Sequence, residues 1–366
     1  MKLIKSSLLV LSSAFLIASC GGSDKQNTQK ESSNDISILG AGSSFGFPIY
    51  SKVFSEYHNA TGAKVNYQSI GSSGGIKQLT SKKVDFGGTD KFLTDEDIQK
   101  IGAPIVHIPT CIGAIALAYN LEGNPQINLS PEVLSAMYLG KITQWNDPKI
   151  QAINPDAKLP NQKITVVHRS DGSGTSYNYT LYLSRVNPEW ESSVGTGASV
   201  KWPTGVGGKG NEGIAGIIQQ TPGSIGYVEL VYAMQTGLKY ASIQNAAGNF
   251  ITPSLEATKN SANIDLPADS RIYIINSEAT DAYPISSFTW AILYKEQNYN
   301  GRTKEQATAL VKALWWLTHQ GQEFCEPLDY VRLPNPAVQV AEKALLSITF
   351  DGQALLTEAP TWQAKK

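Results

Sequence analysis

Cysteine, histidine and surplus charge of either sign are scarce in this sequence of 366 residues. Its three cysteines and four histidines form no CxxC pair, no HExxH segment and no other pair at the spacing of metal ligands. Zinc and iron–sulfur sites depend on such spacing, so neither kind of site is expected. The 30 lysine and arginine residues nearly balance the 31 aspartate and glutamate residues. Because no large basic surface follows from this balance, a nucleic-acid partner is not expected.

Long hydrophobic runs are also lacking. The apolar run over residues 8–18 is shorter than the ~20 residues that a membrane-spanning helix needs, and no later run approaches that length. A basic start before a short apolar run is typical of a secretory signal peptide. The run ends in IASCG (residues 17–21), which resembles the lipobox of bacterial lipoproteins. We therefore expect residues 1–19 to be removed and Cys20 to carry a lipid that anchors the exported chain to a bacterial membrane.

Residues 20–34 form the next segment. After Cys20 they contain no apolar side chain, so they cannot bury a core and are predicted to be a flexible tether. The two remaining cysteines, Cys111 and Cys325, would lie in a compartment where disulfides persist. The sequence leaves two possibilities open for them, a disulfide bridge or two buried thiols.

From residue 35 the sequence alternates short apolar runs with amphipathic segments, which is typical of an α/β sheet. A chain of this length, with 41% hydrophobic residues, is too long for one core and suits two domains. Near-continuous apolar runs at residues 112–119 and 288–294 predict buried strands. The block between them is rich in glycine and proline and has its own strand at residues 164–167. We interpret this block as a second domain inserted into the first.

Two helices carry clear end signals. Ser130 and Pro131 predict the start of one helix, and Gly140 predicts its end. Thr303 and Gln306 form a capping box in front of a second helix, whose apolar residues are spaced for one face. Both helices are expected to pack against a core.

Three loops share one composition and one predicted context. Residues 40–45, 169–175 and 71–75 are built of glycine and small hydroxyl residues, and each stands between a predicted strand and a predicted helix. A helix N-terminus offers free backbone N–H groups and the positive end of the helix dipole, and glycine lets an anion approach the backbone. If the three loops converge, they would enclose a small oxyanion.

Two of these loops also fit the G-x-S-x-G pattern of serine hydrolases, around Ser44 and Ser73. A hydrolase would need a histidine late in the chain, and the candidate there, His319, lies on a predicted packing helix. Residues 205–210 match the dinucleotide pattern G-x-G-x-x-G, but no apolar strand precedes them. No nucleotide cofactor is therefore expected, whereas the hydrolase interpretation stays open.

Seven longer segments occur in one order between residues 38 and 350. They are GAGSSFGFPIY (40–50), VNYQSIGSSGGIKQL (65–79), VDFGGTD (84–90), YLGKITQWND (138–147), VVHRSDGSGTSY (166–177), VGTGASVKWPTGVGGKGNEGIAG (194–216) and GSIGYVEL (223–230). Together they resemble the periplasmic phosphate-binding proteins of bacterial ABC phosphate importers.

The resemblance implies an α/β clamshell of two lobes, each a sheet flanked by helices, with a hinge between them and phosphate in the cleft. In this frame residues 35–117 and 285–366 form lobe I, and residues 118–284 form lobe II. The resemblance also implies the phosphate-binding residues: Ser44, Phe45 (through its backbone N–H), Ser72, Asp90, Arg169, Ser173, Gly174 and Thr175.

Asp90 is the exception among these groups, because an ionised carboxylate can only accept hydrogen bonds. It needs a proton from the ligand, which phosphate carries and sulfate at neutral pH does not. Arg169 offers a planar fork of donors to phosphate oxygens. Asp171 has two open interpretations, a partner that orients Arg169 or a solvated turn carboxylate. His168 stands where relatives often have a second basic residue, and a surface histidine is the simpler interpretation.

The function implied is high-affinity binding of inorganic phosphate outside the cytoplasmic membrane and delivery to the permease and ATPase subunits of an ABC importer. A monomer without enzymatic activity is expected. Two alternatives stay open, a serine hydrolase or phosphatase that uses a G-x-S-x-G loop, and a phosphate sensor that feeds no transporter.

Overall fold

A computed structural model describes residues 36–361 of the chain. The predicted signal peptide, Cys20 and the tether lie outside the described residues. Within them the chain forms a mixed α/β structure around one nine-stranded sheet, with the strand order β2-β1-β3-β12-β4-β8-β6-β7 and β9 paired to β4. The α/β class expected from the alternating apolar pattern is confirmed.

The strands β2, β1, β3 and β12, with the helices packed on them, are called the first lobe below. Its elements are β1 (Ser37–Gly42), α1 (Phe47–Thr61), β2 (Lys64–Ser69), α2 (Ser72–Thr80), β3 (Phe86–Thr89), α3 (Asp95–Ile101), β12 (Ser286–Tyr294), α11 (Lys304–Thr318), the 3₁₀ helices η1 (Gln320–Phe324) and η2 (Glu326–Leu328), α12 (Asn335–Leu346), β13 (Thr349–Phe350) and β14 (Gln353–Ala354). β1 pairs in parallel with both β2 and β3, and β12 is antiparallel to β3.

The strands β8, β6 and β7, with their helices, are called the second lobe. Its elements are β5 (Asn128–Leu129), α4 (Pro131–Tyr138), α5 (Pro148–Ala152), β6 (Thr165–Arg169), α6 (Gly174–Val186), α7 (Pro188–Ser193), β7 (Val206–Gly208), α8 (Gly210–Gln220), β8 (Ser224–Glu229), α9 (Leu230–Gln235), β9 (Lys239–Tyr240), β10 (Ser242–Gln244), β11 (Phe250–Ile251) and α10 (Leu255–Ser261). β6 is parallel to both β7 and β8.

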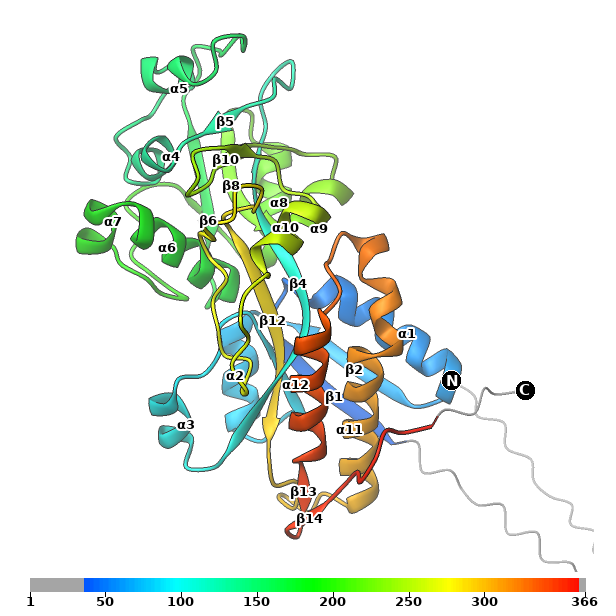
Figure 1. Cartoon of the computed structure of the whole chain (residues 1–366). Coiled ribbons are helices and arrows are strands. Elements are labelled where there is room, and N and C mark those ends of the chain that lie inside the picture. The colour runs from blue at the N-terminus through cyan, green and yellow to red at the C-terminus, as the bar shows by residue number, and fades with distance from the viewer. Residues whose placement is uncertain (1–35, 362–366) are drawn as a thin grey trace, which may run out of the picture. The chain divides into compact units, whose positions relative to one another are not determined.

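One long strand, β4 (Ile105–Tyr119), belongs to both lobes. It pairs with β12 from Ile105 to Ala114 and with β8 from Ile115 to Tyr119. Figure 1 shows β4 and β12 running side by side between the two sets of elements. Both strands are buried along nearly their whole length, as their near-continuous apolar runs predicted. The backbone therefore passes between the lobes inside the sheet.

The predicted helix ends are confirmed. Ser130 caps α4 by accepting a hydrogen bond from the Val133 N–H at 3.2 Å, and Gly140 has a φ of +74° just beyond the helix. Thr303 and Gln306 form both halves of the capping box of α11. These ends depend on contacts within one helical turn, which is why the local sequence predicts them.

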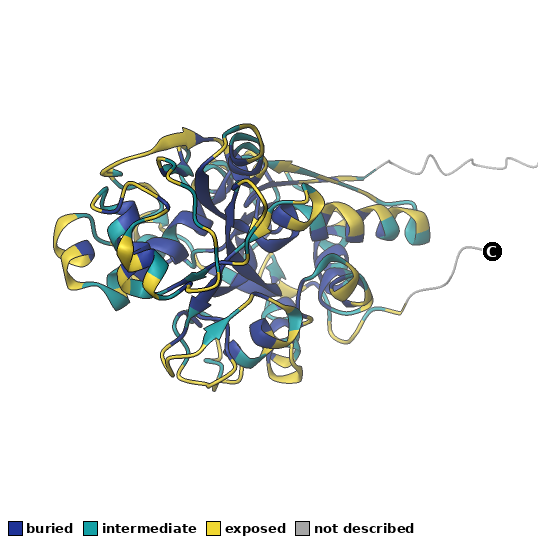
Figure 2. Cartoon of the chain, turned by 90° about the horizontal axis from the view of Figure 1, so that it is seen from above, coloured by how far each residue is buried: buried dark blue, intermediate teal, exposed yellow. Residues whose placement is uncertain are grey.

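The core covers both lobes, and the central strands β4, β8 and β12 are its most buried part. Figure 2 shows buried residues along the sheet and on the inward faces of the helices, with exposed residues on the outer faces and loops. Cys111 on β4 and Cys325 beside η1 are both fully buried and free. Of the two possibilities left open for them, the structure contains the unbridged one.

The lobe boundaries predicted at residues 117/118 and 284/285 stay a prediction. One segment inside the range 118–284 contacts the first lobe, because the Arg271 guanidinium bonds to Asp95 at 2.7 Å and to the Leu93 carbonyl at 3.0 Å. Among residues 36–361, no helix combines the length and the apolar character needed to cross a membrane.

Candidate binding site

Three strands end at the candidate site, and each continues through a loop into the N-terminus of a helix. β1 leads through residues 43–46 into α1, β2 leads through residues 70–71 into α2, and β6 leads through residues 170–173 into α6. The predicted order of strand, loop and helix is confirmed for all three, but the connecting residues are fewer than predicted. Residues 40–42 belong to β1, Arg169 to β6, residues 72–75 to α2 and residues 174–175 to α6. Such helix ends present unpaired N–H groups and a positive dipole, so three of them favour an anion.

The loop after β1 packs tightly against β3. Gly42 has a φ of +146°, and a Cβ atom at this position would lie 2.0 Å from the Gly88 carbonyl oxygen. Only glycine fits so close an approach in this conformation. The Ser43 N–H donates to the same Gly88 oxygen at 2.8 Å. The close contact fixes where the next two residues of the loop lie.

Those two residues, Ser44 and Phe45, are buried and held from two sides. The Tyr232 hydroxyl, from α9 of the second lobe, donates to the Ser44 carbonyl at 2.6 Å. The Tyr330 hydroxyl donates to the Phe45 carbonyl at 2.5 Å, and its ring packs edge-on against the Phe45 ring. Both peptide planes of the loop are thereby oriented.

Asp90 follows β3 and is surrounded by hydroxyl donors. Its Oδ1 accepts hydrogen bonds from Ser43 at 2.6 Å and from Thr289 at 2.8 Å, and its Oδ2 accepts one from Ser72 at 3.3 Å. Burial raises the pKa of Asp90 to about 6, although these hydroxyls and the positive charge of Arg169 act in the opposite direction. Near neutral pH Asp90 is therefore mostly an ionised acceptor in a buried place.

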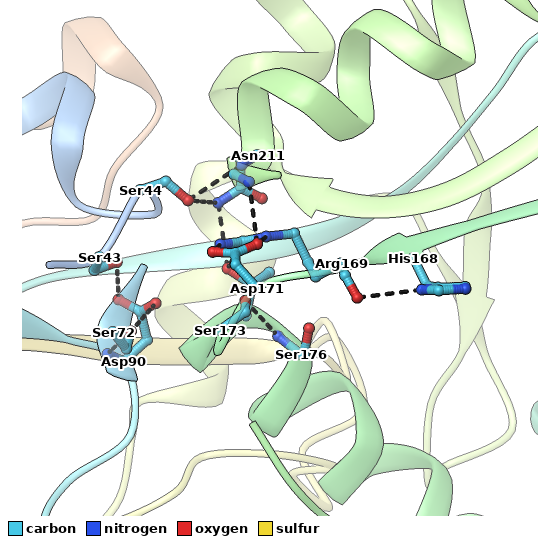
Figure 3. A network of polar contacts seen from close by, with 12 residues as sticks. Ser43, Ser44, Ser72, Asp90, His168, Arg169, Asp171, Ser173, Ser176 and Asn211 are labelled. Atoms are coloured by element: carbon cyan, nitrogen blue, oxygen red, sulfur yellow. Dashed lines mark hydrogen bonds and ion pairs between the residues drawn. The ribbon is translucent and has the colours of Figure 1, made fainter. Parts of the chain in front are cut away.

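Arg169 ends β6 and is held by a bidentate pair. Its Nε and Nη2 donate to the two carboxylate oxygens of Asp171 at 2.7 and 2.6 Å, and its side chain is 1% exposed. Asp171 also accepts from the Gly210 N–H at 3.2 Å. Burial alone would raise the pKa of Asp171, but the bonds and charge of Arg169 lower it overall. Of the two interpretations of Asp171, the structure supports the partner that orients Arg169 (Figure 3).

The N-terminus of α6 carries three of the predicted residues. Ser173 caps the helix by accepting from the Ser176 N–H at 3.0 Å. A Cβ atom on Gly174 would lie 2.5 Å from Ser72 Oγ and 2.7 Å from Asp90 Oδ2. Gly174 therefore lets this helix of the second lobe reach the side chains of the first lobe.

The predicted phosphate ligands come together across the two lobes. Gly174 meets Ser72 and Asp90, and Thr175 Oγ1 lies 3.5 Å from Arg169 Nη1. The Ser73 N–H also bonds to the Gly172 carbonyl at 3.1 Å, which joins the second loop to the third. The side chains of Ser44, Ser72, Asp90, Arg169, Ser173 and Thr175 are all buried. That each of these residues binds phosphate stays a prediction.

The sequence reasoning missed several residues of this network. Ser43 and Thr289 donate to Asp90, and the Asn178 amide donates to the Asp90 carbonyl at 2.6 Å. Asn211 donates to Ser44 Oγ from its backbone N–H at 3.1 Å and from Nδ2 at 3.0 Å. Ser43 could have been found from its loop. Asn178 and Asn211 stand beside or within segments that carry the family resemblance, but nothing in those segments marks them as site residues. Thr289 lies far from any site motif in the sequence.

Asn211 follows the glycine pattern of residues 205–210, which was set aside for lack of a preceding strand. The structure contains a short strand within the pattern itself, β7, which pairs in parallel with β6 and leads into α8. β7 has only three residues and lies at the edge of the sheet, with Val206 44% exposed. A short edge strand needs no apolar run, so this strand gave no sequence signal.

None of the four histidines supports a hydrolase. His168 stacks on Trp202 and bonds to its neighbour's carbonyl, and burial lowers its pKa. His319 bonds to Glu342, and over residues 36–361 no histidine is hydrogen-bonded to Ser44 or Ser73. The same part of the chain holds no cluster of three or more histidine, cysteine, aspartate or glutamate residues fit for a metal ion.

Comparison with known proteins agrees with this geometry. A family model described as a PBP superfamily domain matches residues 27–314. The phosphate-binding protein PstS of Xylella fastidiosa (strain Temecula1) is 40% identical over 353 residues, which cover 92% of this chain and 95% of that protein. This chain belongs to the PstS family. PstS of Haemophilus influenzae is 43% identical over 307 residues, covering 82% of this chain and 90% of that protein.

A solved structure supports the two-lobed fold of the family. It is a high-affinity periplasmic phosphate-binding protein bound with phosphate, 18% identical, with a TM-score of 0.67 and coverage of 84% of this chain and 93% of that chain. The periplasmic-binding-protein fold expected for this member of the PstS family is thereby confirmed.

Proposed function

We propose that this protein binds inorganic phosphate outside the cytoplasmic membrane and delivers it to the permease and ATPase of an ABC importer. The observation that carries the proposal is that Asp90 is the one buried carboxylate among the proposed ligands, which otherwise offer donors. The named function of the relatives, phosphate binding, supports it.

The proposed phosphate ligands are the residues of the three loops together with Asp90. Arg169, fixed by Asp171, offers Nη1 as a charged donor, and the α2 and α6 N-termini offer backbone N–H groups. The set is Ser44, Phe45 through its N–H, Ser72, Asp90, Arg169, Ser173, Gly174 and Thr175. Because both lobes supply donors, the bound anion stabilises the closed arrangement of the lobes. This closed state is the signal to the permease.

Asp90 gives the site its selectivity. Monobasic and dibasic phosphate both carry a proton that can be donated to the ionised carboxylate, whereas sulfate at neutral pH has none. Sulfate would place its charge against the carboxylate with no hydrogen bond between them. A site built around a hydrogen bond rejects analogues that lack the matching group much more strongly than an apolar pocket does.

Calorimetric titration of phosphate and of sulfate, near neutral pH and into protein stripped of bound anion, tests both statements. We expect the unmodified protein to bind one phosphate and no sulfate. In Asp90→Asn, an amide can donate to sulfate, so the phosphate-to-sulfate affinity ratio should fall at least ~100-fold. Asp97→Asn is the control, because this carboxylate caps α3 away from the site.

The outcomes separate two failures. If the unmodified protein binds no phosphate, the proposed function is wrong. If it binds phosphate but Asp90→Asn discriminates against sulfate as well as the unmodified protein does, only the role of Asp90 is wrong.

The proposed protein is a binding protein and not an enzyme. Among residues 36–361, Ser44 Oγ bonds to Asn211 and to no base, so the hydroxyl is oriented but has no described base that would activate it as a nucleophile. Release of alcohol or phosphate from a phosphate or carboxylic ester by the purified protein would contradict this proposal.

Export and anchoring rest on the sequence of the first 34 residues. We propose that residues 1–19 are a lipoprotein signal peptide and that Cys20 carries the lipid. The part of the protein from residue 35 onward then binds phosphate as a monomer at the periplasmic face of the membrane. Metabolic labelling with a radioactive fatty acid should label the protein but not Cys20→Ser. An unlabelled protein would rule out the anchor without affecting phosphate binding.

A further inference from the structure

Asn211 lies in the first turn of α8 and is completely buried between the lobes. It makes four hydrogen bonds. Its backbone N–H donates to Ser44 Oγ at 3.1 Å, and its Nδ2 donates to Ser44 Oγ at 3.0 Å and to Thr175 Oγ1 at 3.2 Å. Its Oδ1 accepts from the Glu229 N–H at 3.0 Å. Among the described residues, no other joins the hydroxyls of two proposed phosphate ligands from different lobes. Figure 3 shows Asn211 bonded to Ser44.

The direction of the Asn211 amide is determined by Glu229. A backbone N–H can only donate, so the group that faces it must be the amide oxygen. The amide nitrogen then faces Ser44 and Thr175, and it can only donate. The two ends of this amide are therefore not interchangeable.

The directions of both hydroxyls follow from that of the amide. A hydroxyl has one hydrogen to donate and two lone pairs to accept with. Ser44 Oγ accepts twice from Asn211, and Thr175 Oγ1 accepts from Asn211 and from Arg169 Nη1 at 3.5 Å. With their lone pairs engaged, both hydroxyls have only their hydrogens left for a ligand.

We propose that Asn211 is a positioning residue that turns the hydroxyl hydrogens of Ser44 and Thr175 toward the bound anion. The proposal rests on the proposed function, since it concerns how the phosphate site is made to donate. Ser44 belongs to the first lobe, whereas Asn211 and Thr175 belong to the second. Contact between the lobes therefore orients the Ser44 donor, so that closure completes the site as well as covering it.

The sharpest variant is Asn211→Asp, which keeps the shape of the side chain and its acceptor for Glu229 but removes the Nδ2 donor. The two hydroxyls would then donate to the introduced carboxylate instead of to the ligand. We expect the affinity for inorganic phosphate, measured by calorimetry on the full chain, to fall at least ~100-fold. Asn211→Ala leaves both hydroxyls free to rotate, and its affinity should fall less, by about 10-fold.

A purely structural role predicts that the less stable variant also binds phosphate more weakly, and it predicts no special coupling to Ser44. Asn211→Ala removes every side-chain contact, so thermal unfolding should show it to be the less stable variant. Our proposal expects the other variant, Asn211→Asp, to bind phosphate more weakly. Asn245→Asp is the matched control, because this buried amide bonds to three carbonyls away from the site and accepts from a backbone N–H. Its phosphate affinity should equal that of the unmodified protein.

A double-mutant cycle separates hydroxyl direction from the added negative charge. In Ser44→Ala the main hydroxyl that Asn211 orients is gone, so Asn211→Asp should cost at least ~10-fold less affinity there than in the unmodified protein. Equal costs in both backgrounds would overturn the proposal, because charge or misfolding would then explain the loss. If the unmodified protein itself binds no phosphate, the proposed function fails instead.

Discussion

The two ends of the candidate site use the same residue types in opposite ways. At one end, the hydroxyls of Ser43 and Thr289 donate into the Asp90 carboxylate. At the other end, the hydroxyls of Ser44 and Thr175 accept from the Asn211 amide. Because a carboxylate only accepts and an amide nitrogen only donates, the partner decides which way each hydroxyl hydrogen points.

The comparison shows that a serine or threonine in a loop has no fixed role by itself. In the proposed site, the Asp90 end would present an acceptor to the ligand, and the Arg169 end would present donors. A ligand that fits both ends has several acceptor oxygens and one proton, which describes phosphate. Each prediction below disturbs one end and leaves the other intact.

Arg169→Met should have the largest effect, because it removes the charged donor and leaves the Asp171 carboxylate unpaired in the site. Loss of one partner of a buried, hydrogen-bonded charge pair in binding costs about 2–5 kcal/mol, so we expect a ~10³-fold loss of phosphate affinity. Calorimetric titration of phosphate measures it.

Arg302→Met is the matched control for that variant. Arg302 is also nearly buried, at 7% exposure of its side chain, and pairs with Asp85 away from the site. It should lower the unfolding temperature but keep the affinity for phosphate. If Arg169→Met still binds phosphate as tightly as the unmodified protein, Arg169 is not a phosphate donor and the proposed donor end is wrong.

Asp90→Asn should change how stability depends on pH in protein stripped of anion. The pKa of Asp90 is about 6 in the folded protein against an ordinary 3.8. Between these values the unfolded chain releases its proton and the folded chain keeps it, so stability falls as the pH rises from about 4 to about 6. The loss is about 3 kcal/mol at 1.4 kcal/mol per pKa unit.

Chemical denaturation at several pH values checks this prediction. Asp90→Asn should lack that fall in the unfolding free energy, and the difference between the two proteins should level off above pH 6. Asp171 has the opposite sign, because its pKa is lowered, so its contribution is lost as the pH falls. Parallel pH profiles for Asp90→Asn and the unmodified protein would show that Asp90 is not the buried acceptor described here.

The sequence predicts the parts of the fold and of the site that depend on short segments. The three loops could be placed between strands and helices, and Ser130 and Thr303 could be recognised as caps, because the deciding contacts lie within a few residues. Asp171 beside Arg169 is of the same kind, since two positions separate them. The family resemblance added Asp90, which no local pattern indicated.

The partners that orient the hydroxyl groups of the site could not be predicted, because they come from segments far away in the sequence. Asn211 lies 167 positions from Ser44, and Thr289 lies 199 positions from Asp90. Neither residue has a motif, a repeat or a spacing that relates it to its partner. Only the packing of one lobe on the other brings Asn211 to Ser44, and only the long sheet brings β12 to β3.

Tyr232→Phe should have the smallest effect, and it compares two tyrosines that hold the same loop. The Tyr232 hydroxyl joins the second lobe to the Ser44 carbonyl, which also accepts from the Phe47 N–H at 3.4 Å. Loss of one such bond costs about 1 kcal/mol, or about five-fold in affinity. Because the bond crosses between the lobes, the loss should appear in phosphate binding measured by calorimetry.

Tyr330→Phe is the matched variant within the first lobe. Tyr330 donates to the Phe45 carbonyl, and its neighbour Val331 bridges to Ile112 in the part of β4 that pairs with β12. The bond joins two residues of the first lobe, although the Tyr330 hydroxyl also faces the buried Glu229 of β8. Its loss should therefore lower the unfolding temperature and change the phosphate affinity less than Tyr232→Phe does, by about two-fold. Equal effects of the two variants on affinity would mean that the loop is held as one unit, and that lobe contact adds nothing specific at Ser44.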